Sequence, residues 1–107
     1  MAFHKVEDLP PRALRYHEEA KQSWHQTAKT RGRVIYFQAL NLDGLSDAEH
    51  SVAFSRLMAN AENEFETEIA KAMPGAPAWA VDPLIRAAID GLHAGYDELA
   101  EQDGGAG

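Results

Sequence analysis

Residues 54–73 read FSRLMANAENEFETEIAKAM and contain the clearest helical pattern in the chain. Apolar side chains recur there at spacings of three and four, which brings them onto one face of an α-helix. They are Phe54, Leu57, Met58, Ala61, Phe65, Ile69, Ala72 and Met73. Upstream, Ser46 and Glu49 match a capping box, and downstream the proline-rich residues 74–77 cannot continue a helix. We therefore expect one long helix between these signals, with its apolar face buried against other elements.

A second helix is expected after this connector. Asp82 is placed to cap it and Pro83 to occupy its first turn, where the N–H that proline lacks would have no partner. Trp79 and Val81, which precede it, are expected to close one end of the core. The helix is expected to run to about Glu101 with an apolar face formed by Ile85, Ala88, Ile89, Leu92, Tyr96 and Leu99.

Small residues stand out near the C-terminus. Ala87, Gly91 and Gly95 lie four apart, so one side of the predicted helix is nearly flat and another backbone could approach it closely. Residues 103–107 are glycine-rich and are expected to form a flexible tail. The chain is therefore predicted to be a single helical domain over 1–102, followed by this tail.

The N-terminal third is also predicted to be helical. Asp8 could cap a helix that starts near Leu9, with Pro10 and Pro11 in its first turn. The apolar stripe of this helix is thin, consisting of Leu14, Ala20, Trp24 and Ala28. Gly32 permits a kink or break, and residues 34–37 (VIYF) resemble a strand. Helix is favoured there because no second strand-like run exists for pairing, and the stop signal follows at residues 41–44.

These elements predict an all-α fold, a three-helix antiparallel bundle whose first helix is long. Helices of about 20 to 30 residues are roughly 30 to 45 Å long, so the bundle would be thin. A thin bundle leaves much apolar surface in water unless a second chain covers it. We therefore expect dimerisation, or a larger assembly, to complete the core.

Composition limits the chemistry. The 107 residues include no cysteine, which excludes disulfides, thiolate nucleophiles and cysteine-based metal sites. No apolar stretch approaches the roughly 18 residues that cross a bilayer, and the N-terminal residues lack a signal peptide's apolar segment, so a cytoplasmic location is expected. No nucleophile elbow or phosphate-binding loop is present, so no catalytic residue is predicted, and a non-enzymatic role is favoured.

Charge is distributed unevenly along the chain. Residues 1–39 contain seven Lys or Arg and four Asp or Glu, a net charge of +3, and the remainder contains three and thirteen, a net charge of −10. Either the two regions pair internally, which we favour, or each sign faces an outside partner. The predicted function is that of a small interaction protein, a regulator, adaptor or accessory subunit that self-associates and binds a protein partner. The candidate partner-binding residues are Trp24, Lys29, Arg31, Arg33, Tyr36 and Phe37, with Trp79 as a further aromatic anchor.

Two alternatives remain open. One is a metalloprotein whose site is built across a dimer from Glu62, Glu66, His93 and Asp97 and holds iron, manganese or zinc. The Asp90-x-x-His93 spacing resembles half of the Glu-x-x-His pairing of bundle di-iron proteins, with Asp in place of Glu. The other is a role with nucleic acid, either binding through the basic segment 29–33 or mimicking DNA with the acidic face of residues 47–103.

Overall fold

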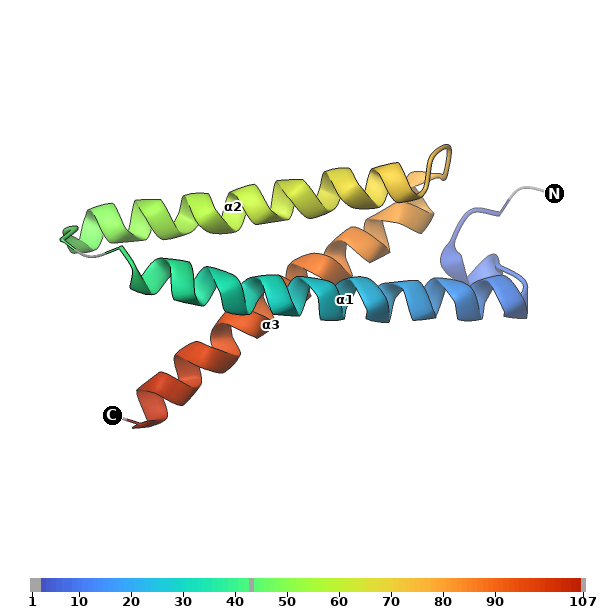
Figure 1. Ribbon diagram of the computed structural model, residues 1–107. Coiled ribbons are helices and arrows are strands. Elements are labelled where there is room, and N and C mark those ends of the chain that lie inside the picture. The colour runs from blue at the N-terminus through green and yellow to red at the C-terminus, as the bar shows by residue number, and fades with distance from the viewer. Residues whose placement is uncertain (1–2, 43, 107) are drawn as a thin grey trace.

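The fold consists of three long helices joined by short connectors. The computed structural model describes residues 3–42 and 44–106, with side chains described through Gln102. A short 3₁₀ helix, η1 (Val6–Asp8), precedes α1 (Pro11–Leu40), α2 (Asp47–Ala72) and α3 (Ala78–Ala106). Consecutive helices run in opposite directions, and α3 crosses α1 diagonally (Figure 1). The predicted all-α, three-helix architecture is confirmed, and the strand-like residues 34–37 lie within α1.

Local signals position the ends of α2 where the sequence places them. The Ser46 side chain accepts a hydrogen bond from the Glu49 N–H at 3.2 Å, and the Glu49 carboxylate accepts one from the Ser46 N–H at 3.3 Å. This reciprocal pair satisfies two donors that the first turn of the helix would otherwise leave free. Gly44 and Gly75, in the two connectors, have φ of +79° and +77°, in the left-handed region that glycine enters at no steric cost.

The first helix begins two residues after the predicted start, with Pro11 in its first turn as expected, but its predicted cap is wrong. Asp8 does not cap α1, because it lies in η1 and its carboxylate instead accepts a hydrogen bond from the His4 N–H at 3.3 Å. Leu9 and Pro10 each precede a proline, which disfavours helical backbone, and both are held at ψ near 150°, at 146° and 154°. The helix can therefore begin only at Pro11.

The predicted start of the third helix is also wrong. Helix α3 begins at Ala78, so Asp82 does not cap it and Pro83 lies inside it. The first turn forms before the proline, because the Pro77 carbonyl accepts hydrogen bonds from the N–H groups of Ala80 and Val81. Pro83 removes one later backbone bond, a loss that this helix tolerates within its second turn.

Trp79 and Val81 consequently belong to α3 and not to the connector. At its other end, α3 continues to Ala106, beyond the end predicted near Glu101. The flexibility expected for residues 103–107 stays a prediction, since their side chains and the whole of residue 107 lie outside the described part of the chain.

Helix α1 is continuous through Gly32, so the kink or break that this residue permits does not occur. The glycine instead allows α1 and α3 to pack closely. A Cβ on Gly91 would fall within 3.0 Å of the His25 carbonyl oxygen, and one on Gly95 within 3.0 Å of the Lys29 carbonyl oxygen. Gly32 meets the backbone of α3 equally closely. The predicted close approach of another backbone to the flat side of the third helix therefore takes place, and its partner is α1.

The core is long and narrow. Its buried members are Ala28, Ile35, Met58, Ala61, Phe65, Ile69, Leu84, Ala88 and Leu92. The radius of gyration is 16.8 Å, where a compact domain of this length has about 13 Å. The accessible surface is 7198 Å², against about 5,900 Å² expected for a monomer of this mass, an excess of about 1,300 Å². The thin bundle predicted from the sequence is therefore observed in the single chain.

Candidate interaction surface

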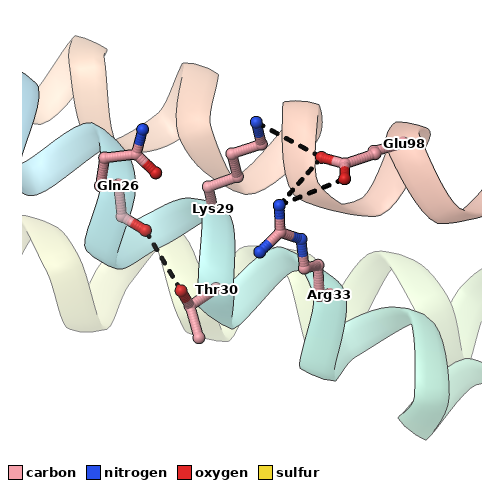
Figure 2. Close-up of polar contacts among 5 residues, drawn as sticks. All are labelled: Gln26, Lys29, Thr30, Arg33 and Glu98. Carbon is pink, nitrogen blue, oxygen red and sulfur yellow. Dashed lines mark hydrogen bonds and ion pairs between the residues drawn. The ribbon is translucent and has the colours of Figure 1, made fainter.

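The basic segment 29–33 points toward acids of the same chain. Figure 2 shows Lys29 and Arg33, one helical turn apart on α1, converging on Glu98 of α3. The Lys29 Nζ lies 3.3 Å from one carboxylate oxygen, and the Arg33 guanidinium lies 3.1 and 3.2 Å from the two. Hydrogen bonds from Arg33 and then Lys29 stabilise the ionised carboxylate, which lowers the pKa of Glu98 below its usual 4.5.

Arg31 points in another direction and reaches α2. Its guanidinium lies 3.2 Å from the Glu64 carboxylate. Because residue 31 is two positions from both 29 and 33, it lies on a different side of the helix. All three predicted cations are thus paired inside the chain, which is the internal pairing that the charge distribution favours. The proposed role of these three residues with nucleic acid stays a prediction.

The predicted aromatic anchors differ in exposure. Trp24 is half-buried and meets Phe65 edge to face, with ring centroids 6.2 Å apart. Tyr36 is buried, and its ring lies 5.7 Å from that of Tyr96. Phe37 is 58% exposed. Trp24 and Tyr36 therefore contribute to the packing of the single chain, and Phe37 is the one of these three that presents its ring to solvent.

The predicted metal ligands are only partly brought together. The His93 Nε2 lies 3.2 Å from a Glu62 carboxylate oxygen, joining α3 to α2. Glu66 and Asp97 do not join this pair, and within the described residues no group of three or more His, Cys, Asp or Glu is arranged to hold a metal. A site shared between two chains would need its remaining ligands from the second copy, and it stays a prediction.

Two histidines of α1 have a role that the sequence analysis missed. His17 is 6% exposed, and its Nε2–H donates to the Ala80 carbonyl oxygen at 2.8 Å. His25, two turns later, donates from Nδ1 to the Ala87 carbonyl oxygen at 3.1 Å. In each histidine the ring nitrogen that contacts the carbonyl must carry a proton, because a carbonyl oxygen only accepts. The spacing of eight between the two histidines, which places them on one face of α1, was the available signal. Their acceptors are main-chain carbonyls, which every residue carries, so the sequence does not indicate which residues of α3 they meet.

Large apolar side chains are exposed mainly where α1 joins α2. Five of the eight such residues among the described side chains lie between positions 34 and 52: Val34, Phe37, Leu40, Leu45 and Val52. In Figure 1 this junction projects to one side, and α3 has crossed away from α2 there. These five side chains are between 40% and 58% exposed, so a large part of the apolar surface at this end is open to solvent.

A groove of about 290 Å³ runs between α1 and α2 next to this surface. Thr27, Thr30 and Val34 line it from α1, and Phe65 lines it from α2. The ion pair between Arg31 and Glu64 crosses it, and Glu68 completes the wall. The groove is predominantly apolar and open, so it can accept a side chain from outside.

No known protein family, curated protein or solved structure matches this chain. Among residues 3–42 and 44–106, no helix combines the length and the apolar character that a membrane-crossing segment requires.

Proposed function

We propose that this protein is a non-catalytic helical interaction protein, a regulator, adaptor or accessory subunit, that self-associates and presents charged helix faces to a protein partner. The proposal depends mainly on the surface that the single chain leaves uncovered. The accessible surface of the whole chain exceeds that of a compact monomer by about 1,300 Å², and Val34, Phe37 and Leu40 are exposed at the α1–α2 junction. Exposed apolar surface of this kind is typical of association sites.

The charged face proposed for the partner lies on α2. Of its four alternating glutamates, Glu62 contacts His93 and Glu64 pairs with Arg31, whereas Glu66 and Glu68 have no ion pair among the described side chains. With a net charge of −7 on the whole chain, the complementary partner is a basic protein surface. Such a contact would accelerate association and would weaken as salt rises.

Sedimentation velocity over a range of concentrations tests the self-association. The expected result is a dimer or larger species that dissociates on dilution. A monomer at every concentration would overturn the proposal. Isolation of the tagged protein from its native cells, followed by mass spectrometry at low and high salt, tests the second element: a basic protein that is retained at low salt and lost at high salt is expected.

A further inference from the structure

We infer that two copies of the chain pair through antiparallel α1 helices, along the face of α1 that turns away from α3. This inference rests on the proposed self-association and specifies its surface. The face consists of Ser23, Thr27, Thr30, Val34, Phe37 and Asn41, which we call the α1 seam. Their spacings of four, three, four, three and four match those of a coiled-coil contact line, with apolar residues at two of the six positions, Val34 and Phe37. The residues of α1 that pack on α3, among them Ala28 and Gly32, lie on the opposite side of the helix.

The side-chain sizes along the α1 seam are complementary to those of a second α1 seam that runs in the opposite direction. Its first half holds the small side chains of Ser23, Thr27 and Thr30, and its second half begins with the larger Val34 and Phe37. An antiparallel pair with its two-fold axis at position 32 sets each large residue of one copy against a small residue of the other. Phe37 then faces Thr27, and Val34 faces Thr30. Parallel pairing would oppose large to large and small to small, which leaves gaps.

The groove between α1 and α2 gives the phenylalanine a place to enter. Thr27 and Thr30 belong both to the α1 seam and to the wall of this groove. Phe37 of a second copy, placed opposite Thr27, would insert beside Phe65. A phenylalanine buries about 150 to 250 Å² when it is enclosed, and Phe37 and Val34 are 58% and 44% exposed in the single chain. The groove of each copy would therefore bury exposed apolar side chains of the other copy across the two-fold axis.

Charge and area favour a second copy as the occupant. The α1 seam contains no ionisable side chain, and the adjacent Arg31 and Arg33 are already paired with Glu64 and Glu98. Glu64 and Glu68 of α2 line the groove that Phe37 would enter. Glu64 is paired with Arg31, and the side chain that the second copy brings to this wall is uncharged. A standard stable interface takes about 800 Å² from each partner, and the exposed side chains of Val34 and Phe37 would supply its apolar centre.

Cysteine cross-linking tests the register, because the natural chain has no cysteine. The variants are Ser23→Cys and Asn41→Cys, both at exposed ends of the α1 seam and away from Val34 and Phe37. In the antiparallel pair position 23 of one copy faces position 41 of the other. The two copies of position 23, or of position 41, are about 27 Å apart along the helices, whereas a disulfide requires Cα atoms within about 7 Å.

We expect disulfide-linked dimers when the two single variants are mixed and oxidised, and none from either variant alone. Cross-linking within one variant alone would indicate parallel pairing and would overturn the inference. Phe37→Glu gives an independent readout and should raise the dimer dissociation constant at least about thirtyfold, as for an interface hot spot. Leu14→Glu is the matched control, since Leu14 is an exposed apolar residue of α1 outside both the α1 seam and the α1–α2 junction, and it should change the constant less than about threefold.

The failure of this inference can be told from the failure of the proposed function. If the natural chain dimerises but the mixed variants do not cross-link and Phe37→Glu still dimerises, the α1 seam is not the interface, and the proposed self-association stands. If the natural chain is a monomer throughout, both are overturned. Circular dichroism of Phe37→Glu checks that the helices remain, and the cross-linking result decides the question if they do not.

Discussion

Replacement of Gly91 by alanine tests how closely α1 and α3 approach. In an exposed helix this change stabilises the fold by about 1 kcal/mol, because alanine has the higher helix propensity. In this protein the added Cβ would meet the His25 carbonyl oxygen well inside contact distance. Backbone cannot rotate away as a flexible side chain can, so the helices would have to separate by about 1 Å and lose packing along the crossing.

The net effect follows from these two opposing terms. Overpacking costs about 1 to 3 kcal/mol, and the upper end applies here because the obstacle is a carbonyl group. After subtraction of the propensity gain, we expect Gly91→Ala to lower the free energy of unfolding by about 2 kcal/mol. The melting temperature of a domain of this size should then fall by about 8 to 16 °C.

Thermal and urea unfolding followed by circular dichroism measure this effect, at one fixed protein concentration because association shifts the melting temperature. Asn60→Ala is the matched control, since Asn60 is exposed on α2 and the change alters helix propensity alone. It should raise the stability by a few tenths of a kcal/mol. If Gly91→Ala also raises the stability, the two backbones are not in contact and the reasoning is refuted.

Three further variants test other contacts. His17→Ala removes a buried side chain and its hydrogen bond to the Ala80 carbonyl and should cost about 1 to 3 kcal/mol, measured by urea unfolding against His4→Ala at an exposed site. Because the folded pKa of Glu98 lies below 4.5, its ion pairs stabilise the fold above that pH and lose their effect as pH falls through the folded value. The difference in melting temperature between the natural chain and Glu98→Gln should therefore shrink on acidification, and an unchanged difference would contradict the ion pairs. Ser46→Ala removes a helix cap and should cost about 1 kcal/mol, and no loss in the same unfolding assay would indicate a frayed first turn.

The helix ends differ in how well the sequence predicts them. The Ser46 and Glu49 signal depends only on side chains three residues apart, so it is readable without knowledge of the fold. The two acid-and-proline signals failed because each proline is compatible with more than one register. The chain before Pro11 must stay extended, whereas Pro83 lies inside a helix that has already started. The backbone hydrogen bonds around each proline distinguish the two cases, and the sequence does not show them.

The buried face of the third helix was also only partly predicted. Large apolar residues such as Ile85 and Tyr96 suggested its direction, but the line of deepest burial runs through Ala80, Leu84, Ala88 and Leu92. Small residues weigh little in a hydrophobic pattern, although here they decide which backbone can approach. The glycine spacing indicated that a close contact exists, and no local pattern specified α1 as its partner.

For the charged residues too, the sequence predicts one part of the arrangement and not the other. The helical period places Lys29 and Arg33 on one side of α1 and Arg31 on another, which is visible in the sequence. The sequence does not reveal which acids they meet. Two of the three cations bind Glu98, which no charge pattern singled out, because the diagonal crossing of α3 brings that residue to them.

The three glycines at the helix crossing also provide a sequence pattern by which homologues could be recognised. A surface residue can drift freely, and a large core residue can be exchanged for another of similar volume. Positions 32, 91 and 95 permit neither, since any side chain there collides with main-chain atoms. A distant descendant of the same ancestor should therefore retain a Gly-x-x-x-Gly pair on its last helix and a lone glycine late in its first, even after the rest of its sequence has become unrecognisable.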